Sequence, residues 1–223
     1  MNSEQVERKE AMLYDELEDE RVQCYLCAHR CRIGEGKRGV CYVRENRGGT
    51  LYTLVYGRTV SQHVDPIEKK PLAHFYPGTR AYSIATVGCN FRCEWCQNAS
   101  ISQMPRERHF IMGEEASPEE IVAAAKRSGC RSIAYTYTEP TIFFEYAYDT
   151  AKLAHQEDVA NVFVTNGFMT SGPGEMLDTF DPYLDAANVD LKAIVDETYR
   201  EVVGARLQPA LDSLKKMKDL GVW

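Results

Sequence analysis

The chain has 223 residues, with 33 Asp and Glu against 26 Lys and Arg, and a formal net charge of −7. This length fits one large domain, or one domain with a small appendage. The excess of acidic residues argues against electrostatic binding to the phosphate backbone of a nucleic acid, although it does not exclude local basic patches. No apolar run reaches the roughly 18 to 20 residues of a membrane span, and residues 1–20 do not resemble a secretion signal, so we expect a cytoplasmic protein that does not act at a membrane.

Eight cysteines are many for a reducing compartment, and seven of them fall into two groups. Grouped cysteines in such a compartment indicate metal binding more than scattered disulfides. Cys130 stands alone, and we expect it to be a small buried hydrophobic residue.

Residues 1–80 are expected to form an amino-terminal extension. Its first twenty residues place Met12, Leu13 and Leu17 on a charged background, which predicts a short amphipathic surface helix.

The next part of the extension contains the first cysteine group. Residues 24–49 are rich in glycine and are expected to form mostly loops. Such a segment buries little apolar area, so it needs a staple, meaning a bound metal or another cross-link, to hold it together. Residues 51–57 read as a strand, and residues 65–78 as an irregular connection containing three prolines.

This first group has the spacing C-x2-C-x3-C-x9-C, formed by Cys24, Cys27, Cys31 and Cys41. A closed zinc site or an auxiliary iron–sulfur cluster would each supply the missing staple, and His29 could replace one ligand. The spacing does not decide between the two metals. We slightly favour a structural site without an open coordination position.

From residue 81 to residue 223 the pattern is regular, with apolar strands alternating with amphipathic helices, as in a parallel α/β sheet. Strands are expected at residues 83–88, 132–138, 161–167 and 187–194. Helices are expected at residues 118–129, 141–155, 175–180 and 209–220. After these four strand-helix units the chain ends where a fifth strand should begin, which favours a partial (β/α) barrel truncated from a longer one.

The second cysteine group directly follows the first of these strands. The run CNFRCEWC gives Cys89, Cys93 and Cys96 the spacing C-x3-C-x2-C. Thiolates suit iron–sulfur clusters, and three ligands on a four-iron cluster leave one iron open for a small molecule. The alternative is a zinc loop, which needs a fourth ligand, and the nearest downstream candidate, His109, lies 13 positions after Cys96.

This loop, with Trp95 before its last cysteine, resembles the signature of the radical S-adenosylmethionine (SAM) superfamily. The resemblance implies that Cys89, Cys93 and Cys96 hold a catalytic [4Fe-4S] cluster whose open iron binds SAM. It also implies reductive cleavage of SAM to methionine and a 5'-deoxyadenosyl radical that abstracts hydrogen. The site would lie at the carboxyl ends of the barrel strands, as in other barrels of parallel strands.

Polar residues at the later strand ends fit a SAM pocket: Glu139, Thr165, Asn166, Asp190 and Lys192. The resemblance implies that Glu139 contacts the SAM amino group and that Asp190 and Lys192 line the SAM and substrate region. Each has a simpler alternative role. Glu139 could favour a helix dipole, the Thr-Asn pair could cap a turn, and Asp190 and Lys192, two apart on one strand face, could form an internal ion pair.

The segments CQN, TNG and DLK are similar to those of glycyl-radical-enzyme activases, such as the pyruvate formate-lyase activating enzyme. Activases commonly carry His where Gln97 stands and an acid where Val164 stands, which counts against an inherited cation site and a protein-glycine substrate. The longer runs CYLCAHRC, DPIEKKPLAHFYPG, GCNFRCEWCQN, AYTYTEPT and VDLKA resemble the AmmeMemoRadiSam-system radical SAM enzymes over residues 24–223. Members of that family continue with more strands.

The leading hypothesis is therefore an enzyme that cleaves SAM and abstracts hydrogen from an unidentified substrate, with a protein backbone as one candidate. Its electron would come from a flavodoxin- or ferredoxin-like donor. The alternative is a metal-stapled binding module of the same ancestry that has lost catalysis. A nucleic-acid-modifying enzyme is least favoured, because the chain lacks a basic, aromatic-rich tract.

Overall fold

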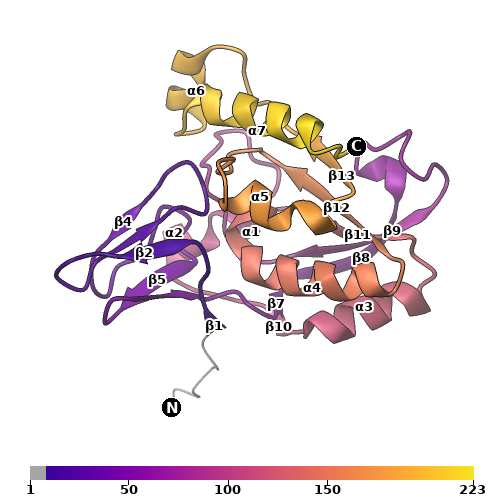
Figure 1. The fold of residues 1–223 in the computed structure, drawn as a ribbon, viewed down its shortest axis with the longest axis horizontal. Helices are drawn as coiled ribbons and strands as arrows, with labels where there is room; N and C mark the ends of the chain where they lie inside the picture. The colour runs from indigo at the N-terminus through magenta and orange to yellow at the C-terminus, as the bar shows by residue number, and fades with distance from the viewer. Residues whose placement is uncertain (1–8) are drawn as a thin grey trace.

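The computed structural model describes residues 9–223, and its largest sheet has five strands in the order β13-β12-β11-β9-β8 (Figure 1). Four of them run parallel, as the sequence predicts: β9 (Arg80–Ala85), β11 (Ser132–Tyr135), β12 (Ala160–Thr165) and β13 (Ala186–Val189). The fifth, β8 (Ser61–Pro66), pairs antiparallel with β9. The sheet therefore begins before residue 80.

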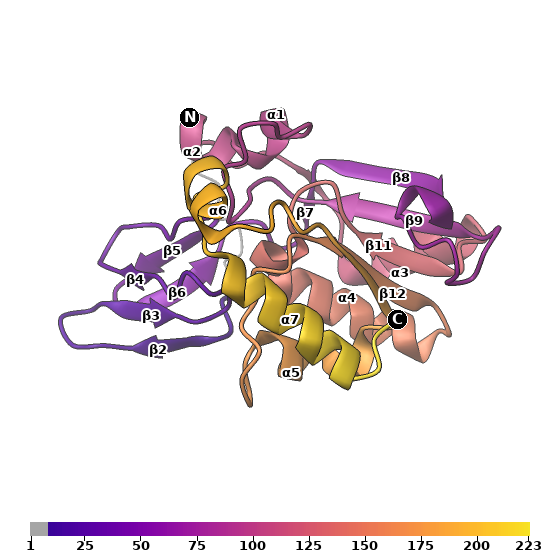
Figure 2. The same ribbon diagram turned by 90° about the horizontal axis from the view of Figure 1, so that it is seen from above.

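Helices cover one face of this sheet (Figure 2). The longer ones are α3 (Pro118–Arg127), α4 (Phe144–Gln156) and α7 (Leu207–Asp219). Helix α6 (Asp196–Val202) lies instead beside residues 92–94, whose backbone N–H groups donate to the carbonyls of Val202 and Val203. The capping box predicted at Ser117 and Glu120 is present and starts α3. In the part of the chain that the structure describes, no helix has both the length and the apolar character needed to cross a membrane.

Shorter elements connect these units. They are α1 (Ala99–Ser102), α2 (Met104–Arg108), α5 (Met176–Phe180), the 3-10 turns η1 (Ile67–Lys69), η2 (Pro140–Phe143) and η3 (Asp181–Tyr183), and the paired strands β7 (Arg58–Thr59) and β10 (Glu114–Glu115). Trp223 lies beside β13, because its backbone N–H donates to the carbonyl of Asp185 (3.0 Å) and its carbonyl accepts from the N–H of Ala187 (2.8 Å).

The amino-terminal part consists of two small antiparallel sheets. They contain β1 (Lys9–Glu10), β6 (Thr50–Thr53) and β5 (Arg44–Arg47), and β2 (Tyr14–Glu16), β3 (Val22–Cys24) and β4 (Arg32–Ile33). The helix predicted in the first twenty residues is wrong from residue 9 onward, and residues 1–8 lie outside the described part. Leu13 and Asp19 have φ of 60° and 58°, which a continuous helix does not allow. Pairing with β3 and β6, distant in sequence, overrides the helical pattern.

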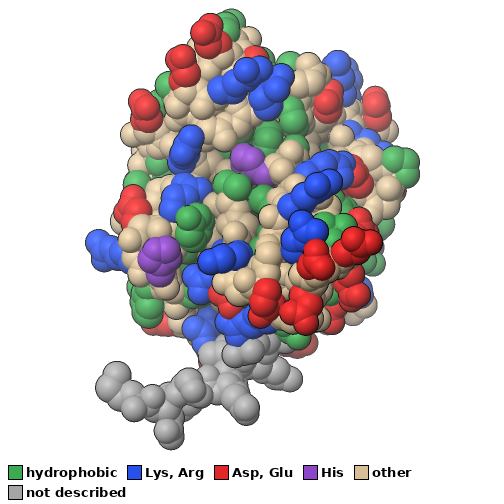
Figure 3. Space-filling view, turned by 90° about the vertical axis from the view of Figure 1, so that its left-hand side faces the viewer, with side chains coloured by type: hydrophobic (Ala, Val, Ile, Leu, Met, Phe, Trp, Pro, Cys, Tyr) green, Lys and Arg blue, Asp and Glu red, His purple; other side chains and the backbone are tan. Residues whose placement is uncertain are grey.

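The two parts share one apolar core. Val22 and Leu51 of the amino-terminal sheets pack in the same cluster as Ile84 and Phe144 of the α/β part. Cys130 is buried in this core, as expected from its isolation in the sequence. The face of the molecule on the side of the amino-terminal sheets carries both basic and acidic side chains (Figure 3).

A buried ion pair joins the two parts. The guanidinium of Arg44 donates to the carboxylate of Glu145 on α4, and only 1% of each side chain is exposed. Arg44 also donates to the sulfur of Cys24 (3.1 Å), and the backbone N–H of Met12 donates to Glu145 (2.7 Å). Removing one member of such a pair leaves a buried charge without its partner.

We expect Arg44→Met to lower the free energy of unfolding by about 3 kcal/mol, because Glu145 then stays buried without a counter-charge. Chemical denaturation followed by circular dichroism measures this loss. The control is Lys126→Met, which removes an exposed ion pair with Glu157 and should cost less than about 1 kcal/mol. Equal costs for the two variants would contradict the role assigned to the buried pair.

Candidate active site

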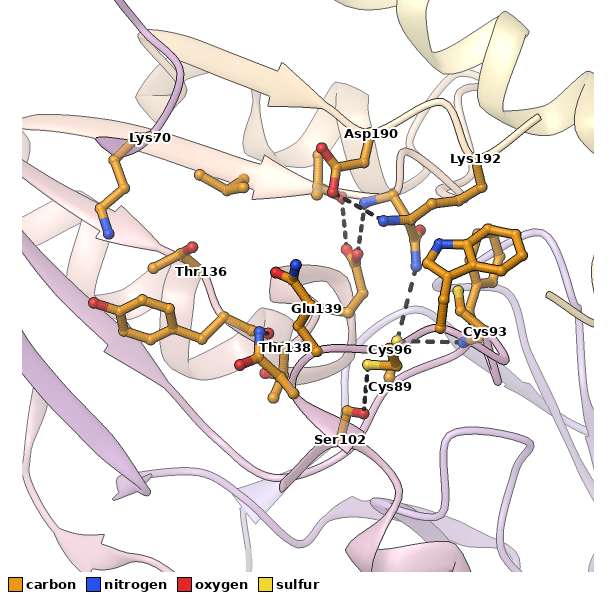
Figure 4. A pocket seen from close by; sticks show the side chains of 18 of the residues that line it. Lys70, Cys89, Cys93, Cys96, Ser102, Thr136, Thr138, Glu139, Asp190 and Lys192 are labelled. Carbon is orange, nitrogen blue, oxygen red and sulfur yellow. Dashed lines mark hydrogen bonds and ion pairs between the residues drawn. The ribbon is translucent and has the colours of Figure 1, made fainter. Parts of the chain in front are cut away.

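A cavity of about 450 Å³ opens at the carboxyl ends of the parallel strands (Figure 4). Parallel strands place the residues that follow them at one edge of the sheet, which explains why segments distant in sequence meet here. Every site residue predicted at the second cysteine group and the strand ends lines this cavity: Cys89, Cys93, Trp95, Cys96, Glu139, Thr165, Asn166, Asp190 and Lys192.

The cysteine loop leaves β9 through Gly88, where any other side chain would have to push neighbouring atoms aside. Gly88 has φ of +105°, and a Cβ atom there would lie 2.7 Å from Cγ1 of Val43. The loop then folds on itself. The N–H of Phe91 donates to the sulfur of Cys89 (3.3 Å), and the N–H of Cys96 donates to the carbonyl of Cys93 (3.2 Å).

Two asparagines fasten this loop to the neighbouring strand ends. The Asn98 amide donates to the carbonyl of Tyr137 after β11 (2.7 Å), and the Asn166 amide donates to the side-chain oxygen of Asn90 (2.7 Å). The same Asn166 nitrogen lies 3.9 Å from the sulfur of Cys89. The positions of the three thiols therefore depend on β11 and β12 as well as on β9.

The three thiols fit a cluster better than a single ion. All three cysteines are free, and no fourth cysteine and no histidine belongs to the described residues lining the cavity. Across residues 9–223, no three Cys, His, Asp or Glu side chains are placed to share one metal ion. A closed zinc site needs four ligands, whereas three thiols suffice for a four-iron cluster with one open iron.

Burial raises the pKa of the Cys89 thiol, and the nearby Glu139 carboxylate raises it further. Burial also raises the pKa of Cys93, although the ammonium of Lys192 works in the opposite direction. Thiols of this kind remain protonated at neutral pH unless a metal takes the place of the proton. The thiol environment is thus one that metal binding, and not a free thiolate, would satisfy.

Glu139 connects two strand ends through its buried carboxylate. One oxygen accepts from the N–H (3.0 Å) and hydroxyl (2.6 Å) of Thr141 and from the hydroxyl of Thr165 (2.7 Å). The other accepts only from the N–H of Asn166 (2.8 Å), so this oxygen can still accept a further donor. Burial raises the pKa of Glu139, while the hydrogen bonds from Asn166, Thr141 and Thr165 lower it in part.

Asp190 and Lys192 lie just beyond β13, in the loop after Val189 and not on the strand as expected. The Lys192 ammonium donates to Asp190 (2.9 Å), so the internal ion pair considered from the sequence is present and faces the cavity. Burial lowers the pKa of Lys192, but the hydrogen bond and charge of Asp190 outweigh it, and the net shift is upward. Lys192 therefore stays charged.

With this geometry established, comparison with known proteins decides the family. The family model for the radical SAM superfamily matches residues 83–223, more than half of the chain. The chain belongs to the radical SAM superfamily. The matched region begins in β9 and includes the three cysteines of the cavity.

Similar proteins extend this match toward the amino terminus. The chain is 46% identical over 215 residues to "Uncharacterized protein MJ0808" of Methanocaldococcus jannaschii, covering 96% of this chain and 62% of that relative. A second protein of that organism, "Uncharacterized protein MJ0674", is 33% identical over 82 residues, 36% of this chain and 19% of the relative. The chain thus spans about three-fifths of the length of the first relative.

Two solved structures resemble the fold at low identity. QueE from Escherichia coli aligns with a TM-score of 0.43 at 17% identity over 74% of each chain. TYW1 with a lysine-pyruvate adduct bound aligns with a TM-score of 0.40 at 18% identity, over 60% of this chain and 50% of its own.

The cavity is also lined by residues that the sequence analysis does not select. They include Lys69, Lys70, Gln97, Asn98, Ser102, Thr136, Tyr137 and Thr138. Thr136, Tyr137 and Thr138 directly follow β11, so the strand-end rule that found Glu139 could have found them. The two lysines belong to the DPIEKKPL run before β9, which carries no strand-end signal.

The amino-terminal cysteines lie outside this cavity. Burial raises the pKa of Cys27, and the nearby sulfurs of Cys24, Cys31 and Cys41 raise it further, so the four thiols lie close enough to affect one another. All four are free.

We expect Gly88→Ala to bind less than about half of the wild-type iron after anaerobic reconstitution, because the added methyl group displaces Cys89. Iron per chain is the measurement. The control is Gly174→Ala, a glycine with φ of +69° whose added Cβ would meet no atom within 4 Å. Wild-type iron content in Gly88→Ala would show that the close approach to Val43 does not position the loop.

Proposed function

We propose that this chain is a catalytically competent radical SAM enzyme whose [4Fe-4S] cluster is held by Cys89, Cys93 and Cys96. A reduced cluster at this site would supply one electron to SAM, giving methionine and a 5'-deoxyadenosyl radical that abstracts hydrogen from the substrate. The observation that supports the proposal is the set of three free thiols, without a fourth ligand, on the wall of a cavity of about 450 Å³.

The polar groups of the cavity suit a zwitterionic ligand. The less occupied oxygen of Glu139 can accept from an ammonium, which supports its proposed contact with the SAM amino group. The Lys192–Asp190 pair offers a donor and an acceptor beside Cys93. Trp95 is half exposed at the cavity and can cover part of a bound ligand.

Two further residues position these groups. Thr165 and Asn166 donate hydrogen bonds that orient Glu139, and Asn166 also donates to Asn90 in the cysteine loop.

The electron donor that we propose is a small flavodoxin- or ferredoxin-like protein. Sulfur atoms near the surface support this, because Cys93 and Cys96 are only partly buried. The resemblance to glycyl-radical-enzyme activases and to AmmeMemoRadiSam-system enzymes remains a proposal about ancestry and reaction type.

In the test of this proposal, Cys93→Ala should form no 5'-deoxyadenosine above the background without reductant, because the cluster loses a ligand. The protein is reconstituted anaerobically, reduced, given SAM and analysed by chromatography. The matched control is Cys130→Ala, which changes a buried cysteine outside both groups and should retain wild-type product. Equal product from the wild type and Cys93→Ala would refute the assignment.

The competing function is a metal-stapled module that no longer cleaves SAM. Electron paramagnetic resonance of the reduced cluster separates the two, because SAM binding to an open iron changes the signal. We expect that change in the wild type. An unchanged signal together with absent product would favour the module.

We also propose a structural metal site at Cys24, Cys27, Cys31 and Cys41. The buried guanidinium that donates to Cys24 supports it, since Arg44 can stabilise negative charge on metal-bound thiolates. Metal analysis of the reconstituted protein should find about four irons and about one zinc per chain. About eight irons would replace this proposal with an auxiliary cluster.

A further inference from the structure

The cavity has a second polar end that the proposed SAM chemistry does not use. Lys69 and Lys70 line it: Lys69 is the last residue of the turn η1, which directly follows β8, and Lys70 is the residue that caps this turn. In Figure 4, Lys70 lies on the opposite side of the cavity from the three cysteines, with Thr136 and Glu139 between them. A ligand that contacts Lys70 therefore extends away from the cluster loop.

This end is organised around the buried carboxylate of Asp65. Lys69 donates to one of its oxygens (2.8 Å), and Lys70 (2.7 Å) and Ser83 (2.9 Å) donate to the other. The hydroxyl of Tyr137 donates to that second oxygen as well. The four donors hold the carboxylate of Asp65 in place. The carboxylate in turn holds the Lys70 ammonium without any ligand.

The donors here outnumber the acceptors. The Lys70 side chain is only 2% exposed, yet its ammonium makes one hydrogen bond among the described residues and otherwise faces the ring of Tyr137 at 4.6 Å. An ammonium has three N–H donors, so up to two remain without an acceptor. Thr136, whose hydroxyl can both donate and accept a hydrogen bond, also lines the cavity.

The charge balance points the same way. Two lysines share one carboxylate, which leaves this end of the cavity with one net positive charge in a chain whose overall charge is −7. A buried ion pair is poor support for stability, because desolvation offsets much of the attraction. A purely structural role would leave the remaining N–H donors of the buried Lys70 without a partner.

We propose that this end of the cavity binds an oxyanion of the substrate, a carboxylate or a phosphate, which makes the substrate a small acidic molecule. The inference rests on the proposed function, because it names the substrate class of the same cavity. Lys70 and Lys69 would donate to the oxyanion, and Asp65 would hold both lysines in place. A protein backbone carries no charge to satisfy them.

The experiment titrates the reconstituted protein, saturated with SAM and without reductant, with inorganic phosphate and with succinate in an isothermal calorimeter. At least one probe should bind saturably, and the tighter of the two identifies phosphate or carboxylate as the preferred group. Lys70→Met should weaken that binding at least about tenfold, and Lys69→Met about threefold, because each removes a charged donor. Lys126→Met, a lysine remote from the cavity, is the matched control.

The proposal is overturned if neither probe binds the SAM-saturated wild type, or if Lys70→Met and Lys126→Met bind alike. The titration is repeated without SAM, and binding that is seen only without SAM also overturns the proposal. The last outcome would assign the lysines to SAM itself. Should Lys70→Met fail to fold, Lys69→Met decides, since its side chain is 62% exposed and its loss leaves the buried pair intact. Formation of 5'-deoxyadenosine by the wild type is measured separately, so failure of the proposed function is distinguished from failure of the anion site.

Discussion

The buried carboxylate of Glu139 holds the site together. It accepts hydrogen bonds from the segment after β11 and from the end of β12, and Asn166 carries the connection onward to Asn90 in the cysteine loop. A buried carboxylate needs such donors, and here they come from several segments of the chain. Its role is therefore first to assemble the strand ends, and only its less occupied oxygen remains for a ligand.

Much of this arrangement could be predicted from sequence, because the responsible signals are local. The alternation of strands and helices predicts the parallel sheet, and strand-end positions identify Glu139, Thr165 and Asn166 as cavity residues. The spacing of the three cysteines needs no tertiary information. Asp190 and Lys192 were placed on the wrong element, yet they still line the cavity, because the loop beyond a parallel strand shares its edge of the sheet.

What could not be predicted depends on contacts between distant segments. The strands from residue 9 onward form by pairing with β3 and β6, which a local amphipathic pattern does not reveal. Strand β8 joins the sheet antiparallel, and no strand is predicted there from the sequence; its last two residues overlap the start of the irregular connection predicted for residues 65–78. Lys69 and Lys70 are neighbours with the same chemistry, but one is exposed and the other buried, and only the fold distinguishes them.

The amino-terminal cysteine segment is also coupled to the cluster loop by direct contact. The ring of His29 contacts the backbone carbonyl of Asn90 (2.8 Å) and packs against Phe168, with ring centroids 4.7 Å apart. Asn90 adjoins Cys89, and the carbonyl of Phe168 accepts from the Asn90 amide (3.4 Å). His29 lies between two of the four amino-terminal cysteines, so a metal that orders that segment would also restrain the backbone beside Cys89. The two cysteine segments are thus joined by direct contacts through His29, Asn90 and Phe168.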